Sequence, residues 1–79
     1  MDSKWLEFEE QPQLAGRKTR VWKVLGKGGG IVLGSVQWYG GWRQYVFMPS
    51  SNCLFNRTCL RDLAAFCEEQ MVARARVGP

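Results

Sequence analysis

The sequence predicts an α+β domain in which a three-stranded antiparallel β-meander is followed by one C-terminal helix, in the order β-β-β-α. Two strand-like runs rich in valine and aromatic residues flank Gly40-Gly41, and a third such run precedes the glycine-rich residues 26–30. Apolar residues recur at helical spacing after residue 56. We expect the helix to pack on one face of the sheet.

The central hairpin is predicted in residues 33–49, LGSVQWYGGWRQYVFMP. Two glycines supply the positive φ values that a two-residue type I′ or II′ turn requires, so Gly40 and Gly41 are expected to form the whole loop. Tyr39 then lies opposite Trp42, and this pair sets the register of the two strands.

One face of this hairpin is expected to form the core, because its middle is apolar and Gly34 leaves room for the ring of Phe47. The residues assigned to this face are Val32, Gly34, Val36, Trp38, Arg43, Tyr45 and Phe47. The opposite face has polar side chains at its centre and presents Tyr39 and Trp42 beside the turn. These two aromatic residues are candidates for contact with a partner.

A first strand is predicted from Arg20 to Gly26, and the helix is predicted from Asn56 to Arg74, with Asn56 or Thr58 as its N-cap. The side of the helix expected to face the sheet consists of Leu60, Leu63, Ala64, Cys67 and Met71.

Residues 26–30, Gly-Lys-Gly-Gly-Gly, share only their composition with a phosphate-binding loop. Such a loop needs Ser or Thr after its Gly-Lys pair and then the start of a helix, whereas here Ile31 opens another strand. We therefore expect a flexible hairpin loop, whose amides and Lys27 could still contact a phosphate backbone.

At 79 residues the chain has room for one domain with one small core. Residues 16–74 are assigned to this β-β-β-α domain, residues 75–79 to a basic tail and residues 1–15 to an N-terminal arm. The arm carries three apolar residues, Trp5, Leu6 and Phe8. They either extend the core of the domain or form a hook that binds a partner.

Several classes of protein are excluded by what the chain lacks. No apolar run approaches the ~20 residues of a membrane span, so we expect a cytoplasmic protein of the host cell. Three cysteines and no histidine predict neither a disulfide framework nor a metal site. Cys67 and Cys59 fall on and beside the apolar stripe of the helix and are expected to be small buried residues. No cofactor is predicted.

Catalysis is not expected. Acid–base chemistry would have to rest on Asp62, Glu68 and Glu69, which fall on the solvated side of the predicted helix. These three residues are better explained as the charged, solvent-exposed side of the helix, so we do not expect an enzyme.

Basic residues crowd around the first strand. Within eleven residues the chain places Arg17, Lys18, Arg20, Lys23 and Lys27. Lysine commonly protects an edge strand from aggregation, which is one interpretation of this patch. The alternative is contact with nucleic acid or with an acidic protein.

The residues from Leu33 to Phe66 carry the pattern LGxxxWYxxWRxYxFxP followed by CLxDxxxF. In this pattern the chain resembles small uncharacterised proteins encoded in phages and prophages. The resemblance covers about half of the chain and implies a phage accessory protein with the β-β-β-α fold. Such proteins often bind host machinery, and anti-CRISPR proteins are the nearest functional class in size, by analogy.

Two functional hypotheses follow. In the first, the protein is an inhibitor or adaptor that docks on a host protein or nucleoprotein complex. In the second, it binds single-stranded nucleic acid directly, with aromatic rings stacking on bases and cations tracking phosphates. The candidate partner-binding residues are Tyr39, Trp42, Arg43, Arg17, Lys18, Arg20, Lys23 and Lys27.

Overall fold

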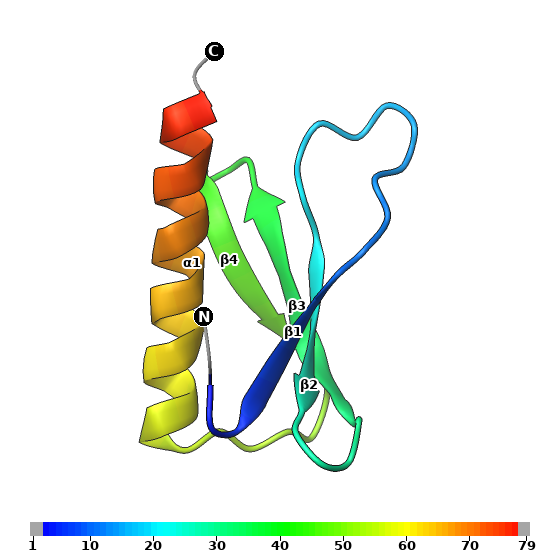
Figure 1. Cartoon of the computed structure of the whole chain (residues 1–79), viewed down its shortest axis with the longest axis vertical. Helices are drawn as coiled ribbons and strands as arrows, with labels where there is room; N and C mark the ends of the chain where they lie inside the picture. The colour runs from blue at the N-terminus through cyan, green and yellow to red at the C-terminus, as the bar shows by residue number, and fades with distance from the viewer. Residues whose placement is uncertain (1–2, 78–79) are drawn as a thin grey trace.

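The computed structural model describes residues 3–77 and contains a four-stranded antiparallel sheet with one long helix running alongside it (Figure 1). The strands follow one another in chain order, so the sheet is a meander. The elements are β1 Leu6–Glu10, β2 Trp22–Gly26, β3 Val32–Tyr39, β4 Gln44–Pro49 and α1 Arg57–Val77. The α+β class, the antiparallel sheet and the C-terminal helix are confirmed, but the sheet has four strands and not three.

The additional strand, β1, lies in the segment assigned to an N-terminal arm. All five of its residues pair with β2, from Leu6 opposite Gly26 to Glu10 opposite Trp22. Leu6 is only 2% exposed, and Phe8 packs against the same core. Five residues of alternating apolar and acidic type are too few to distinguish a strand from a helical turn. The segment forms a strand because the unpaired edge of β2 offers hydrogen-bond partners to the amides and carbonyls of β1.

A buried serine fixes the start of β1. Ser3 is 3% exposed, and its hydroxyl oxygen accepts the backbone N–H of Leu6 at 3.1 Å and that of Trp5 at 3.3 Å. The same hydroxyl donates to Oδ2 of Asp62 in α1 at 2.5 Å. Asp62 is therefore half-buried and ties the helix to the first strand, rather than standing in solvent as predicted.

The β3–β4 hairpin is closed by a four-residue loop, residues 40–43, and not by a Gly-Gly turn. Tyr39 pairs with Gln44, and Trp38 pairs with Tyr45, which is a shift of two residues from the predicted register. Neither loop glycine takes the positive φ that the shorter turn needs. The observed register sets the rings of Trp38 and Tyr45 edge to face with centroids 5.4 Å apart, and such cross-strand pairs contribute ~0.2–1 kcal/mol. Within the strands, an even shift leaves each side chain on its predicted face.

A β-bulge at Leu33 reverses the predicted faces at the start of β3. Val24 pairs with Gly34, but the next pair joins Leu25 to Val32, so Leu33 has no residue opposite it. Leu33 packs against the core, whereas Val32 is 45% exposed. One inserted residue moves all residues beyond it to the other face, because side chains alternate along a strand.

The core lies between α1 and the sheet, and rings from three elements meet in it. Phe66 of α1 stacks on Phe8 with ring centroids 4.0 Å apart and meets Trp22 edge-on at 5.1 Å. Val24 and Val36 are fully buried beside these rings. The complete buried set is Leu6, Trp22, Val24, Val36, Tyr45, Cys59, Leu63 and Phe66.

The buried side of α1 is rotated from the one predicted. Cys59 is buried, as expected, and Phe66 is buried beside it, whereas Leu60 is 53% exposed and Ala64 is also exposed. The other three predicted residues do contact the core, namely Leu63, Cys67 and Met71. Turning the ring of Phe66 inward buries more apolar area than burying Leu60 would, which accounts for the rotation.

A side-chain cap fixes the start of α1, and the helix runs beyond its predicted end. The side-chain oxygen of Asn56 accepts the backbone N–H of Cys59 at 2.8 Å, so Asn56 is the N-cap. The helix continues to Val77, three residues past the predicted end. Residues 75–77 of the predicted tail are thus helical, and residues 78–79 lie outside the described part of the chain.

The glycine-rich segment forms the β2–β3 hairpin loop, as predicted. The amide of Gly30 donates to the carbonyl of Gly26 at 3.1 Å, and Gly28 and Gly30 have φ values of 87° and 67°. β3 follows directly, with no helix after the loop.

We expect Gly34→Ala to lower the free energy of unfolding by about 3 kcal/mol, as overpacked cores do. A Cβ atom at this position would lie 2.7 Å from the ring of Phe47 and would also clash with the carbonyl oxygen of Met48. Gly40→Ala is the matched control, because a Cβ there meets no atom within 4 Å. Urea unfolding measures both variants, and equal losses of stability would contradict the packing described for β3 and β4.

Candidate partner-binding site at one end of the sheet

Three segments that are distant in sequence lie at the same end of the sheet (Figure 1). They are the β1–β2 connection, the β3–β4 loop and the last turns of α1. Alternate loops of a meander lie at the same end, and α1 runs antiparallel to β4, so its C-terminus reaches that end as well. We call this region the aromatic-basic end and define it by Tyr39, Trp42, Arg43, Lys18, Arg74 and Arg76.

An exposed aromatic pair occupies the hairpin tip. Trp42 is 68% exposed and Tyr39 is 43% exposed, and their rings meet edge to face at 5.1 Å. The loop backbone is fixed, because the amides of Trp42 and Arg43 both donate to the carbonyl of Tyr39, at 3.2 and 2.9 Å. The Tyr39 ring lies so close to Gly41 that a Cβ there would be 2.9 Å from it. The pair is therefore held in place while it faces solvent.

Arg43 stands in a backbone conformation that is uncommon for its residue type. Its φ is 56°, in the left-handed region, which costs about 1–3 kcal/mol in a residue other than glycine. The side chain is exposed in the loop and not on the core face, where the two-residue turn would have placed it. Such conformations occur often at functional sites, and here the exposed Arg43 directly follows Trp42 in the hairpin loop.

Two of the predicted cations are already engaged within the domain. Arg20 forms a bidentate ion pair with Glu10, at 2.8 and 2.6 Å, and its guanidinium lies 4.9 Å from the ring centre of Trp22. The hydrogen bond from Arg20 and its positive charge lower the pKa of Glu10. Arg17 donates to the carbonyl of Pro12 at 2.5 Å and is half-buried. These contacts give both arginines a role in shaping the β1–β2 connection.

Sequence reasoning missed two cations of the aromatic-basic end. Arg74 stacks over Trp38 with its guanidinium carbon 4.0 Å from the ring centre, and Arg76 is exposed one half-turn further on. Both fall in the region predicted to be the end of the helix and a basic tail. Their number and position were visible in the sequence, but only the antiparallel packing of α1 on β4 places them beside the hairpin tip.

The remaining predicted cations lie elsewhere. Lys23 is in the middle of β2, between Glu9 and Ser35 of the neighbouring strands. Lys27 is in the β2–β3 loop at the opposite end of the sheet, where its amide donates to the carbonyl of Trp5 at 3.0 Å. The structure thus does not bring these two lysines to the aromatic pair.

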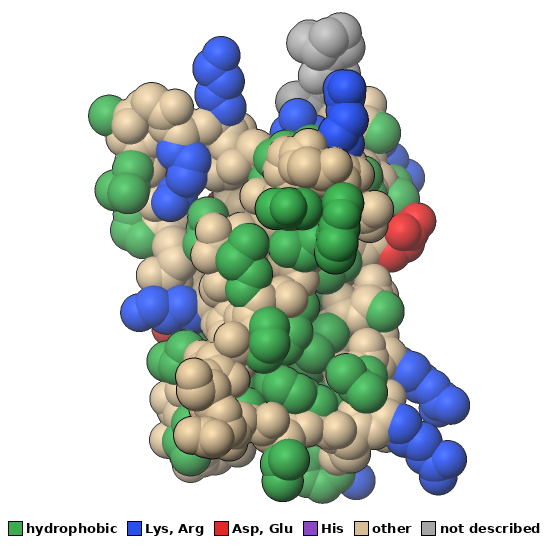
Figure 2. All heavy atoms as spheres, turned by 180° about the vertical axis from the view of Figure 1, so that it is seen from behind, with side chains coloured by type: hydrophobic (Ala, Val, Ile, Leu, Met, Phe, Trp, Pro, Cys, Tyr) green, Lys and Arg blue, Asp and Glu red, His purple; other side chains and the backbone are tan. Residues whose placement is uncertain are grey.

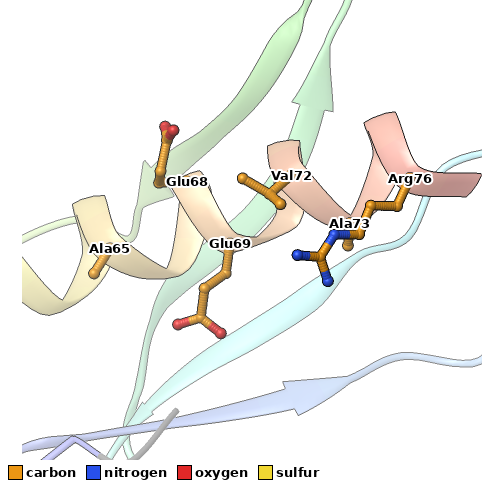
Figure 3. Close-up of a pocket in the computed structure, with 6 residues that line it drawn as sticks. All are labelled: Ala65, Glu68, Glu69, Val72, Ala73 and Arg76. Atoms are coloured by element: carbon orange, nitrogen blue, oxygen red, sulfur yellow. The ribbon is translucent and has the colours of Figure 1, made fainter.

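A shallow hollow runs along the outer side of α1 (Figure 3). It is lined by residues of this one helix, namely Ala65, Glu68, Glu69, Val72, Ala73 and Arg76. Glu68 and Glu69 are both exposed and point in different directions, so they do not form a carboxylate pair. The hollow is an ordinary stretch of helix surface.

Comparison with known proteins relates the chain to a small phage protein. No family model and no solved structure matches the chain. An uncharacterised 9.3 kDa protein of Acholeplasma phage L2 is 32% identical over 76 residues, which cover 94% of this chain and 97% of the phage protein. The chain belongs to the same family as this phage protein. Within residues 3–77 no helix is long and apolar enough to cross a membrane.

We expect Glu10→Gln to reduce stability by at most about 1 kcal/mol, because the ion pair with Arg20 is exposed. Folding lowers the pKa of Glu10 below its ordinary value through the hydrogen bond from Arg20, so the pair stabilises the protein above that ordinary value, and the effect is lost as the pH falls through the lowered pKa. Unfolding of both proteins at pH 7 and pH 3 measures this. The difference between them should be smaller at pH 3 than at pH 7, and a difference that does not shrink would refute the assignment.

Proposed function

We propose that this phage-type protein acts without catalysis, by docking its aromatic-basic end on an acidic surface of a host protein or nucleoprotein complex. The observation that carries the proposal is the exposed indole of Trp42, which a fixed loop holds at an end of the sheet that carries a net positive charge. In this view the protein is an inhibitor or adaptor of host machinery, comparable in size and manner to anti-CRISPR proteins.

Trp42 has the properties of an interface anchor. Tryptophan, tyrosine and arginine dominate the binding energy of protein interfaces, and all three occur within five residues of this hairpin. The two hydrogen bonds to the carbonyl of Tyr39 fix the loop in advance. A pre-organised loop loses little conformational entropy on binding, which favours affinity.

The surrounding charge favours an acidic partner. The three segments at this end carry six cationic side chains, Arg17, Lys18, Arg20, Arg43, Arg74 and Arg76, and one carboxylate, that of Glu10. Glu10 neutralises Arg20, and the other five cations give this end of the sheet a net positive charge. A charge of this kind speeds encounter with an acidic surface and rejects basic ones.

We expect Trp42→Ala to weaken binding to the host partner at least about thirtyfold, the equivalent of roughly 2 kcal/mol at a hot spot. Capture from a nuclease-treated host lysate would supply the partner, and calorimetric titration would measure the affinity. Leu54→Ala is the matched control, since Leu54 is 94% exposed at the opposite end of the sheet. Equal effects of the two substitutions would contradict the proposal.

Direct binding of single-stranded nucleic acid is a second candidate, favoured by one observation. The cations of the aromatic-basic end come from three separate segments, as they would around a phosphate backbone, while the rings of Tyr39 and Trp42 are free to stack on bases. The edge-to-face arrangement of the two rings leaves room for one base on the indole rather than for a continuous stack. Protein docking is therefore the better supported function.

Salt dependence separates the two functions. Nucleic-acid binding should weaken steeply with ionic strength, with a logarithmic slope near −0.7 for each neutralised phosphate. The double variant Lys18→Glu/Arg76→Glu should flatten this slope, whereas Arg57→Glu/Arg61→Glu, which changes the same charge at the far end of α1, should not. Fluorescence titration with oligonucleotides measures the slope. Tight, salt-sensitive binding without any protein partner would replace the docking proposal with the nucleic-acid one.

A further inference from the structure

The first strand forms an edge of the sheet. Within residues 3–77, only β2 pairs with β1. The carbonyl of Trp5 accepts the amide of Lys27 at 3.0 Å, and the amide of Gln11 donates to the carbonyl of Val21 at 2.8 Å. These bonds flank β1 and show that its odd-numbered residues turn their backbone groups toward β2, so the even-numbered residues turn theirs outward. We call this outward row the β1 edge; its residues are Leu6, Phe8 and Glu10.

Both ends of the β1 edge are closed by contacts within the chain. The amide of Leu6 donates to the hydroxyl oxygen of Ser3 at 3.1 Å. At the other end, Pro12 has no N–H group, and its carbonyl accepts a hydrogen bond from Arg17 at 2.5 Å. The outward groups of the two remaining residues lie between these points. They form a short row of backbone donors and acceptors, which suits an extended segment of a few residues.

The strand is acidic in a chain that is basic as a whole. Residues 6–10, LEFEE, hold three carboxylates and no cation, whereas the formal net charge of the chain is +4. On the side of the molecule shown in Figure 2, Lys and Arg project around the periphery, and Asp and Glu occupy little of the surface. Glu10 is engaged by Arg20. Glu7 and Glu9 are exposed, so they can interact with the charges of a neighbouring segment.

We infer that the β1 edge binds a basic, extended segment of another protein, which lengthens the four-stranded sheet by one antiparallel strand. Main-chain hydrogen bonds to Phe8 and Glu10 supply affinity, and side chains at alternate positions of the segment supply specificity, as in other cases of strand addition. The β1 edge shares no residue with the aromatic-basic end. The inference therefore does not depend on the docking proposal.

The side chains of β1 define the pattern that the segment should have. Residues directly opposite one another in an antiparallel pair share a face, and opposite charges at such positions are stabilising. Lys or Arg is therefore favoured opposite Glu7 and Glu9. The charge of Glu7 is not matched within the sheet, because the residue across from it in β2 is Leu25. The position between the two cations lies opposite Phe8, which is half-buried at the border of the core and suits an apolar residue.

The same charges reject other occupants of the β1 edge. Pairing with β1 of a second copy would set Glu7 and Glu9 against carboxylates of the copy, and like charges across strands are destabilising. An acidic segment is rejected for the same reason. Basic arms outside folded domains are common in nucleic-acid-binding proteins and are free to extend along a strand. Such an arm is the kind of partner that the β1 edge fits.

Hydrogen exchange of the free protein tests whether the β1 edge is open. The amides of Phe8 and Glu10 should exchange at least about tenfold faster than those of Glu7 and Glu9, because exposed amides need no local opening and the other two face β2. Equal protection of the four amides would overturn the inference, since it would mean that the edge is covered.

Peptide binding tests the preference for a basic segment. The probes are the acetylated, amidated peptides TKVKVKT and TEVEVET, titrated by NMR. The basic peptide should bind saturably and slow the exchange of the Phe8 and Glu10 amides, although the net charge of +4 opposes general attraction to it. The acidic peptide should not bind. Absence of binding by the basic peptide would overturn the inference and leave the docking proposal untouched.

A matched pair of charge reversals locates the binding site. Glu7→Lys/Glu9→Lys should reverse the preference, so that the acidic peptide binds more tightly than the basic one. Glu68→Lys/Glu69→Lys makes the same change of charge at exposed positions of α1 and should leave the preference as it is. Equal effects of the two double variants would overturn the inference.

Two N-methylated forms of the basic peptide separate strand addition from simple charge attraction, and both are tested on the wild-type chain. In the antiparallel arrangement the valines turn their amides toward β1 and the lysines turn theirs away. N-methylation of the valines should weaken binding at least about tenfold, because it removes the main-chain hydrogen bonds that supply affinity. N-methylation of the lysines should preserve binding. Equal binding of the two forms would overturn the inference.

Discussion

The contact of Phe66 with two strands is the interaction on which the rest of the structure depends. This one side chain of α1 stacks on Phe8 of β1 and meets Trp22 of β2 edge-on, so it joins the helix to the half of the sheet that is farthest from β4. Val24 and Val36 are buried beside it. In a domain of 79 residues, aromatic rings supply a large share of the apolar area that can be buried. The rotation of α1 and the inclusion of β1 both follow from where this ring lies.

The sequence was sufficient for elements whose signals are local. The alternation of residues in the hairpin, the asparagine before the helix and the glycines between β2 and β3 each predicted a feature that the structure contains. What could not be predicted depends on partners distant in the chain. β1 is defined by the free edge of β2, and the register of the hairpin is set by a ring pair, Trp38 with Tyr45, that competes with the preference of Gly-Gly for tight turns.

The candidate site also has a part that the local sequence predicts and a part that depends on residues distant in the chain. Tyr39, Trp42 and Arg43 were found from the hairpin pattern, and they do form one exposed cluster, although Arg43 reaches it through the longer loop. Counting charges along the chain could not tell that Arg20 is neutralised by Glu10. Nor could it bring Arg74 to the hairpin, because that contact depends on the packing of α1. Which candidate residues lie exposed together thus depends on tertiary neighbours, even when their types are evident in the sequence.

The hydrogen bond between Ser3 and Asp62 has a consequence for how the chain is made. It joins residues 59 positions apart, and the stacking of Phe8 on Phe66 spans nearly the same separation. During synthesis the N-terminal strand leaves the ribosome first, yet its contacts with α1 cannot form until most of the helix has followed. The two hairpins between β2 and β4 need no such delay, since their partners are close in sequence. β1 is therefore made before the hairpins that follow it but completes its contacts after them.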